Sequence, residues 1–392
     1  MTTDTQKSIH WTELDILRGL AALMMVLNHL GYKILASNLV DNGFAGSLLF
    51  ISSFAPVLFF FVTGVGYGIQ SSRKKKASPW YGIFNKFFIL VLADLLMHWS
   101  EGRWLGLDFL GFIALSSLVL EFTRRTKSPL TYCVVGFVLI SLMRYLLGPF
   151  IQAFGYDRLG WGVLNWILGT KDTAGVSYPL SPWMAYPFAG YIIGVAAMHY
   201  RGFIETHRWR VVSGLLVLGG LNSVAALILL QRGASFFRWG TVGVGFYVAS
   251  FAVISLSLAG ILAMCGEPKL RVWQDALSLK GIASLAVVPV HYFLIYLVIL
   301  VGVTGVDLFK YSLIAIPVLA GSFFLARSVE KLSQIIRQVK TQKIVWFGLV
   351  ALFVVAAGLT LFYSQQSIFL ALFPRTLGQL VLCLLFVIRW PL

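Results

Sequence analysis

Apolar stretches of about twenty residues recur along the whole chain, and they constrain its fold more than any other feature. A helix of that length crosses the hydrocarbon core of a bilayer. Lipid offers no hydrogen-bond partners to a free backbone, so such stretches are expected as helices, which satisfy their own backbone groups. The chain is 58% hydrophobic and only 12% charged, whereas a soluble domain carries about twice that charge. These features predict an all-α polytopic membrane protein.

Hydropathy predicts a bundle of about twelve transmembrane helices, with about ten in a core and two more at the C-terminal end. The expected spans are 13–36, 44–70, 80–99, 104–122, 129–148, 181–199, 210–230, 240–263, 278–302, 308–328, 344–363 and 368–389. A polar, basic stretch separates the last two spans from the others. We therefore predict a core over 1–330, a cytoplasmic linker over 331–343 and two additional spans over 344–392.

The net charge of +16 is unevenly distributed over the expected loops. With the residues at the adjoining span ends included, the loops and termini on one side hold twenty Lys and Arg, and the opposite loops hold six. The positive-inside rule then predicts that both termini are cytoplasmic, in a plasma (inner) membrane protein. The same rule accounts for the charge without nucleic acid, so the expected surroundings are membrane lipids. The polar N-terminus and the lack of a cleavage site predict that the first span is retained.

The first span reads ELDILRGLAALMMVLNHLGY and carries Asp15, Arg18, Asn28 and His29 in or beside an apolar helix. Arg18 and His29 are eleven residues apart, close to three helical turns, so they share one face. The helical rise puts His29 roughly 16 Å deeper than Arg18. Asp15 lies one turn before Arg18 and can pair with it.

His29 has two interpretations. An ionisable residue at that depth is a functional hypothesis by default. The alternative is a structural histidine bonded to a neighbouring helix, with Arg18 reaching to the lipid headgroups.

The arrangement of Arg18 and His29 within LRGLAALMMVLNH resembles the opening motif of the acyltransferase-3 family of membrane acyltransferases. SSFAPVLFFFVTGVGYG is similar to the second span of that family. GLDFLGFIALSSLVLEF and SPWMAYPFAGYIIGVAA resemble segments of the related heparan-α-glucosaminide N-acetyltransferase branch, and LSLKGIASLAVVPVHYFLIYL resembles a late span of both branches. These segments occur in order from about residue 13 to about residue 300.

The resemblance implies a catalytic role for His29, as a base or a transient acyl carrier, supported by Asp15 and Arg18. It implies acyl-CoA, by default acetyl-CoA, as a cytoplasmic co-substrate, bound with the help of Arg18, with no permanently bound cofactor or metal. The acceptor would be a hydroxyl or amine of an extracytoplasmic glycan or lipid-linked molecule, as in O-acetylation of a polysaccharide. A neutral histidine suits either role. For donor binding, the third span offers only Lys86, where the family pattern has a more Arg-rich entry.

A second pair repeats the geometry of the first span. Lys280 and His291 are also eleven residues apart, on a span expected to run in the same direction. Lys280 would lie at the donor side, and His291 would line the transfer path. The alternative is a structural histidine in a helix kinked at Pro289.

Other candidates lie toward the predicted outer side. Asp94 and His98 are one turn apart and can pair, either to orient an acceptor hydroxyl or to anchor the end of the third span. The segment 149–180 is rich in Gly and aromatic residues, including Trp161 and Trp166. It is interpreted either as a functional loop on the acceptor side or as an interfacial re-entrant piece.

A transporter or flippase for a small molecule or lipid-linked saccharide is the alternative function. Ion-coupled carriers commonly place acidic residues deep in the membrane. Of the fifteen acidic residues here, Asp94 and Asp108 are those expected well within spans. This shortage favours the enzyme. The oligomeric state stays open.

Overall fold

The computed structural model describes residues 11–40, 42–73, 79–100, 107–154, 167–168, 176–232, 243–265, 267–278, 282, 284–338 and 342–388. Within these ranges, the chain is helical apart from its turns, and extended backbone pairs only at two isolated bridges. The first seven helices are α1 (Thr12–Ile34), α2 (Ser37–Val40), α3 (Gly43–Ser52), α4 (Ala55–Ser72), α5 (Trp80–Ser100), α6 (Phe109–Arg124) and α7 (Pro129–Phe154). They are followed by α9 (Leu180–Trp183), α10 (Ala185–His199), α11 (Arg201–Thr206), α12 (Arg208–Leu230), α13 (Val244–Cys265), α14 (Arg271–Leu277), α15 (Ser284–Leu300), α16 (Leu308–Gln338), α17 (Gln342–Ser364) and α18 (Ile368–Ile388).

The helices confirm a polytopic membrane protein. In the described part of the chain, nine segments are long and apolar enough to cross a bilayer, with α3 and α4 counted together. The other three expected spans contain the shorter helices α6, α10 and α15. Each of the twelve expected spans therefore holds a helix, while the number that cross the membrane and their orientation stay predictions.

The second expected span, 44–70, is two helices rather than one. α3 ends at Ser52, and α4 begins at Ala55 with Pro56 in its first turn. Proline has no backbone N–H and is favoured at such a position, so it starts a helix more readily than it continues one. The amide of Asn28 donates to the carbonyl oxygen of Leu49 at 2.9 Å, which helps to satisfy the end of α3.

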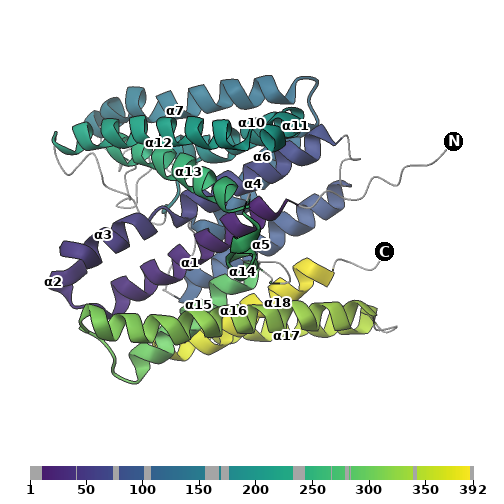
Figure 1. Cartoon of the computed structure of the whole chain (residues 1–392). Coiled ribbons are helices and arrows are strands. Elements are labelled where there is room, and N and C mark those ends of the chain that lie inside the picture. The colour runs from purple at the N-terminus through teal and green to yellow at the C-terminus, as the bar shows by residue number, and fades with distance from the viewer. Residues whose placement is uncertain are drawn as a thin grey trace.

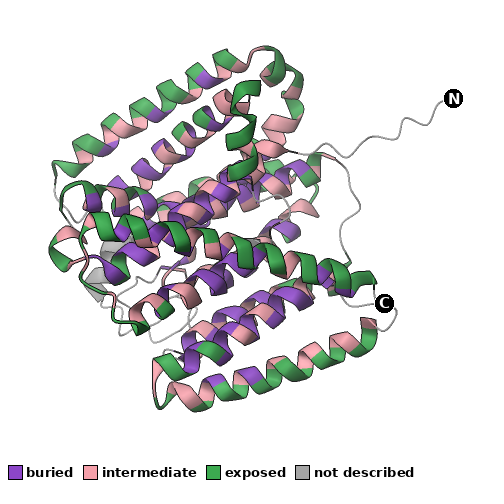
Figure 2. Cartoon of the chain, turned by 60° about the horizontal axis from the view of Figure 1, so that its bottom comes forward, coloured by how far each residue is buried: buried purple, intermediate pink, exposed green. Residues whose placement is uncertain are grey.

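The centre of the bundle is built around α1, which contacts α3, α4, α13, α15 and α16. Buried residues concentrate on these inner helices, while outer helices such as α12 and α17 expose large apolar side chains (Figure 2). An apolar exterior of this kind is what lipid contact requires. α4 and α10 cross very closely: a Cβ atom at Gly64 would overlap the carbonyl oxygen of Pro187, and one at Gly190 would overlap that of Phe61. The absence of a side chain at these glycines allows the two backbones to approach so closely.

The C-terminal helices pack against the rest of the bundle. α16 continues to Gln338, so most of the stretch expected as a linker is helical. α17 and α18 lie side by side along one edge of the bundle (Figure 1), and α18 also contacts α5, α15 and α16. The division into a core, a linker and two additional spans stays a prediction, although α18 forms part of the packed interior.

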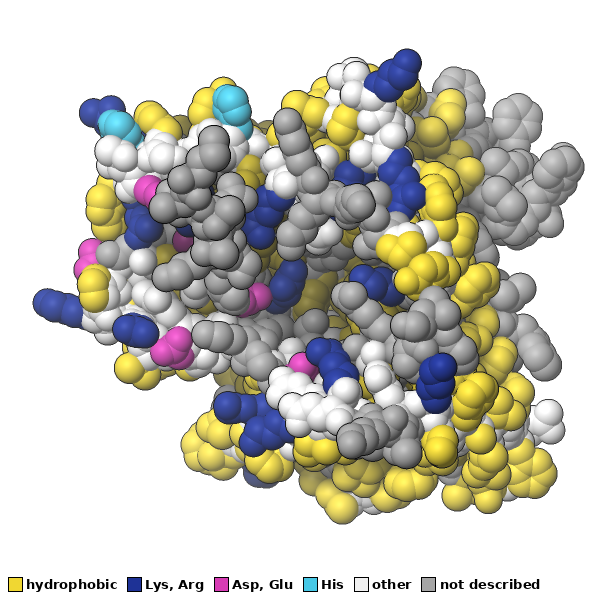
Figure 3. All heavy atoms as spheres, turned by 90° about the vertical axis from the view of Figure 1, so that its right-hand side faces the viewer, with side chains coloured by type: hydrophobic (Ala, Val, Ile, Leu, Met, Phe, Trp, Pro, Cys, Tyr) yellow, Lys and Arg dark blue, Asp and Glu magenta, His cyan; other side chains and the backbone are white. Residues whose placement is uncertain are grey.

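The start of α1 and the end of α18 lie at the same end of the bundle (Figure 1). The ends of α4 and α6 and the start of α5 lie there too. Residues from these three helix ends line one cavity together with residues from the start of α1 and the end of α18. We call this the basic end, because Lys and Arg side chains are spread across it (Figure 3).

Candidate active site

Two histidines from distant parts of the sequence meet in the interior. Nδ1 of His29 on α1 lies 2.8 Å from Nε2 of His291 on α15. The two rings are stacked, with centroids 5.1 Å apart. His291 is completely buried, and His29 is partly buried. Each interpretation of His291 therefore has an observation in its favour. Its hydrogen bond to Val287 of its own helix fits a structural histidine, and its contact with His29 fits a residue of the transfer path.

The hydrogen bonds of the pair determine which nitrogen atoms carry hydrogen. Nδ1 of His291 lies 2.8 Å from the carbonyl oxygen of Val287, which can only accept, so this nitrogen carries the hydrogen. In a neutral His291, Nε2 is then the acceptor, and Nδ1 of His29 donates to it. The acceptor nitrogen of a neutral His29 is therefore Nε2. A base or nucleophile at His29 would act through this atom.

Tyr292 completes a cluster of three rings. Its ring stacks on His29 with centroids 4.8 Å apart, and it lies 4.4 Å from the ring of His291. Its hydroxyl group is 3.4 Å from Nε2 of His29. On the other side of α1, the Tyr311 hydroxyl donates to the carbonyl oxygen of Leu27 at 2.9 Å, which ties α16 to the helix that carries His29.

A cavity of about 460 Å³ opens from the basic end toward these residues. Its lining on α4 runs from Gln70 to Phe59, eleven residues or roughly 16 Å of helix. On α15, it is lined by Leu285 and Val288. His291 is the next residue along that face, three positions after Val288. The cavity wall therefore comes within one helical turn of the histidine pair.

The lining of the cavity changes from polar to apolar with depth. Near the basic end lie Arg18 and Lys86, the two cationic residues of the lining. Arg18 is half-exposed and pairs with Asp15, Nη1 to Oδ1, at 3.1 Å. The expected pairing of these two residues is confirmed. The inner lining is apolar, with residues such as Phe59 and Phe109.

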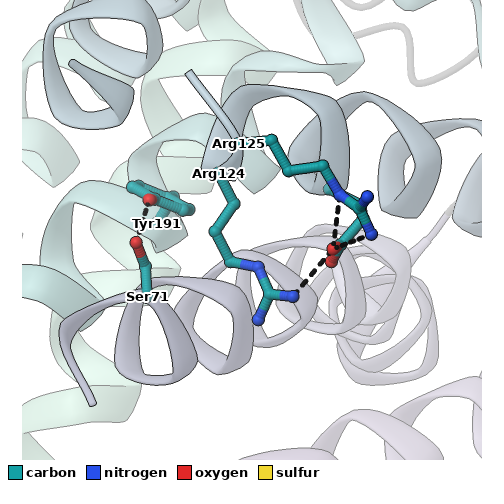
Figure 4. Close-up of polar contacts among 5 residues, drawn as sticks. Ser71, Arg124, Arg125 and Tyr191 are labelled. Carbon is teal, nitrogen blue, oxygen red and sulfur yellow. Dashed lines mark hydrogen bonds and ion pairs between the residues drawn. The ribbon is translucent and has the colours of Figure 1, made fainter. Parts of the chain in front are cut away.

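Glu121 is the one acidic residue of the described cavity lining, and its carboxylate is already neutralised. It accepts from Arg124 at 2.7 Å and from Arg125 at 3.1 Å, and both arginine side chains converge on it (Figure 4). The guanidinium group of Arg125 also lies 3.7 Å above the ring of Trp80. Neither arginine is among the residues that line the cavity, so Arg18 and Lys86 are the better placed cations for a ligand there.

Asp94 and His98 are buried together on α5. Oδ2 of Asp94 lies 3.5 Å from Nε2 of His98, so the expected pairing is confirmed. The same oxygen accepts from the backbone N–H of Asp108 at 3.1 Å. Asp108 precedes α6 and caps it, rather than lying within a span as expected, because the helix begins only at Phe109. These contacts favour an anchoring role for Asp94 at the junction of α5 and α6.

Three expected site residues lie outside the described part of the chain. They are Lys280, Trp161 and Trp166. Their proposed roles at the donor and acceptor sides stay predictions.

Sequence reasoning did not single out Tyr292 or Arg375 as site residues. Arg375 is almost completely buried in α18, and its guanidinium carbon lies 5.8 Å from the ring centroid of Tyr292. An arginine in the middle of an apolar run was a visible signal. The run that carries it lies after the resembling segments, so its position beside the histidines could not be read from the sequence.

A family model described as heparan-alpha-glucosaminide N-acetyltransferase, catalytic, matches residues 11–232. This is more than half of the chain, and it includes Arg18, Lys86 and His29 but ends before His291. No curated protein matches the chain, and no solved structure matches it.

Proposed function

The chain belongs to the heparan-α-glucosaminide N-acetyltransferase catalytic family of acetyl-CoA-dependent membrane enzymes, and from this premise we propose how its residues carry out the transfer. The donor enters the cavity at the basic end. His29 acts at the inner end of the cavity, and the acceptor reaches it from the opposite side of the membrane. The observation that carries this proposal is the histidine pair one helical turn beyond the cavity lining.

The cavity suits an acyl-CoA donor in both shape and chemistry. Its length of roughly 16 Å along α4 suits an extended thioester arm. The apolar inner lining suits the arm and the acetyl group, whereas Arg18 and Lys86 at the basic end suit the phosphates of CoA. We propose that this end is cytoplasmic, as the loop charges predict, and that the chain lies in the plasma (inner) membrane with both termini inside.

His29 is proposed to work through Nε2. In direct transfer, Nε2 takes the proton of the acceptor hydroxyl or amine while the acceptor atom bonds to the acyl carbon, and the proton then passes to the departing thiolate. With a covalent intermediate, Nε2 itself bonds to the acyl carbon, and the C–S bond breaks so that the thiolate leaves. In a second step the acceptor atom bonds to the acyl carbon, the bond to Nε2 breaks, and the freed Nε2 takes the acceptor proton and passes it to the thiolate. In both routes, His291 accepts from Nδ1 of His29 and so keeps Nε2 available as the acceptor.

We propose a hydroxyl or amine of an extracytoplasmic glycan or lipid-linked molecule as the acceptor. His29 lies roughly 16 Å deeper than Arg18 along α1, which begins at the basic end. The path to His29 is therefore shorter from the opposite side of the membrane than from the basic end. Trp161 and Trp166 are retained as proposed acceptor-side residues. Asp94 and His98 are proposed to support that side indirectly, through their contacts at the start of α6.

The test is thiol release from acetyl-CoA by the purified protein, with and without candidate acceptors. His29→Ala is expected to abolish release, and His199→Ala, at an exposed histidine at the end of α10, is expected to retain it. Both variants must elute as monodisperse protein. Full turnover by His29→Ala would overturn the proposed role of His29. Substrate counterflow in liposomes without thiol release would instead support a transporter.

The two catalytic routes are separable with the donor alone. A covalent route predicts that radiolabelled acetyl-CoA labels the wild-type protein and leaves His29→Gln unlabelled. Direct transfer predicts no label in either protein, together with turnover that starts only when acceptor is added.

A further inference from the structure

Arg375 is the most deeply buried cation in the described part of the chain, with 1% of its surface exposed. Its Nη1 donates to Oγ of Ser100 at 2.9 Å. Its guanidinium carbon lies 5.8 Å from the ring centroids of both Tyr292 and Tyr296. A charge at such a position is expensive in a membrane protein and is a functional hypothesis by default.

The backbone around Arg375 is held in place from a second direction. One turn further along α18, Nε2 of Gln379 donates to the carbonyl oxygen of Ala93 at 2.9 Å. Ser100 and Ala93 both belong to α5, so two bonds tie α18 to that helix. The guanidinium group is therefore held where α18 meets α5, and α18 also packs against α15, which carries Tyr292.

The hydroxyl of Tyr292 lies beside Nε2 of His29, the nitrogen that is proposed to react. Its ring stacks on His29 at an interplanar angle of 27°, and its oxygen lies 3.4 Å from Nε2 of His29. An acyl carbon in contact with Nε2 would carry its carbonyl oxygen into reach of this hydroxyl. A hydrogen-bond donor in reach of that oxygen can stabilise an oxyanion.

We propose that Tyr292 donates a hydrogen bond to the oxyanion formed during acyl transfer, and that Arg375 of α18 orients and polarises Tyr292 for this task. This inference rests on the proposed function. Tyr292 would be a catalytic residue, because it contacts the reacting atoms. Arg375 would be a positioning residue, which acts through Tyr292.

The chemical step balances without a further reactant. The acceptor heteroatom bonds to the acyl carbon, its proton moves to Nε2 of His29, and the carbonyl π pair moves onto the oxygen. Tyr292 donates to that oxygen and keeps its own proton. When the carbonyl re-forms, the C–S bond breaks, and the sulfur takes the electron pair and the proton from His29. If His29 is the nucleophile, the same oxyanion forms and Tyr292 serves it in the same way.

A buried guanidinium group suits this supporting role for two reasons. Its field acts in a medium of low dielectric constant, where it favours negative charge developing nearby. A cation near an aromatic ring is attracted to that ring and withdraws electron density from it, which makes the phenol a stronger hydrogen-bond donor. α18 lies beyond the residues matched by the family model, so this component is contributed by the C-terminal part of the chain.

The first test compares two tyrosines on α15 that are equally distant from Arg375. Tyr292→Phe keeps the ring stack and removes the donor, so kcat should fall by about 10²–10³-fold while the KM for acetyl-CoA is unchanged. Tyr296→Phe makes the same chemical change one helical turn away and should leave kcat near the wild-type value. Wild-type kcat in Tyr292→Phe would overturn the proposal, as would an equal loss in both variants.

The second test is a double-mutant cycle between Arg375 and Tyr292. Arg375→Gln should lower kcat in the wild-type background but have little further effect in Tyr292→Phe, and Arg375→Lys should restore part of the loss. Thr376→Val removes a buried hydroxyl of α18 that donates to the carbonyl oxygen of Leu372 in the same helix, and it should leave kcat unchanged. Independent effects of Arg375→Gln and Tyr292→Phe on kcat would show that Arg375 does not act through Tyr292. If Arg375→Gln does not fold, the pair Tyr292→Phe and Tyr296→Phe decides the question alone.

These outcomes are distinguishable from failure of the proposed function. If wild-type protein releases no thiol from acetyl-CoA, or His29→Ala retains full activity, the reaction at His29 is wrong. If His29→Ala is inactive and Tyr292→Phe is fully active, only the oxyanion role is wrong.

Discussion

His29 and His291 are 262 positions apart in the sequence and share a 2.8 Å contact between Nδ1 and Nε2. α1 and α15 each place a histidine in the interior at the same depth, and the contact joins them into one unit. Because Nδ1 of His291 is bonded to its own helix, the direction of the hydrogen bond between the rings is determined. One imidazole can then orient the other, as in histidine sites where a second group selects the tautomer.

We predict that the identity of residue 291 controls turnover through this orientation. His291→Phe keeps a flat ring but has no acceptor for Nδ1–H of His29, so kcat should fall by about 10²-fold or more. His291→Gln supplies an amide oxygen as an acceptor and should retain more activity than His291→Phe. The measurement is kcat and the KM for acetyl-CoA in each variant. Equal activity in the two variants would argue that the acceptor at this position is irrelevant.

A second prediction concerns the cations of the cavity. Arg18→Ala and Lys86→Ala should each raise the KM for acetyl-CoA about tenfold or more, since a hydrogen bond to a charged group contributes about 1.5–3 kcal/mol. The effect should disappear with the acetyl thioester of N-acetylcysteamine, which lacks the nucleotide and its phosphates. Lys310→Ala, at an exposed lysine beside Asp307, is the matched control. An unchanged KM in both cavity variants would place the CoA phosphates elsewhere.

A third prediction separates anchoring from acceptor binding at Asp94. Asp94→Ala leaves the partly buried N–H of Asp108 and the buried ring of His98 without this carboxylate. Removing one partner of a buried hydrogen bond costs about 1–3 kcal/mol, so the melting temperature should drop. If Asp94 is only an anchor, the KM for the acceptor should stay the same in folded protein. A raised acceptor KM at unchanged stability would restore the acceptor-binding interpretation.

A fourth prediction concerns the crossing of α4 and α10. Gly64→Ala and Gly190→Ala each place a methyl group on a backbone carbonyl oxygen of the other helix, so the helices must move apart. Overpacking of this kind typically costs about 1–3 kcal/mol. Gly220→Ala on α12 has open space around it and is the control. Thermal unfolding in one detergent should show a loss for the first two variants only, and equal melting temperatures in all three would contradict the close crossing.

The part of the site that α1 contributes could largely be predicted from the sequence. The depth of His29, its shared face with Arg18 and the pairing of Arg18 with Asp15 follow from the rise and repeat of a single helix. The signal for the break in the second span was also local, because Pro56 cannot donate a backbone hydrogen bond. The position of Lys86 in the same cavity as Arg18 could not be derived in this way, because the two belong to different helices.

The sequence by itself determined the class of protein and the form of its parts. Apolar runs of membrane length have to satisfy their backbone internally, and only the helix does so within each run. Tertiary structure alone decided that His291 faces His29, that Tyr292 stacks on His29 and lies against His291, and that Arg375 of α18 lies beside Tyr292. These contacts depend on how closely and at what angle distant helices pack. Each helix presents several faces that are equally apolar, so local periodicity cannot say which face meets which neighbour.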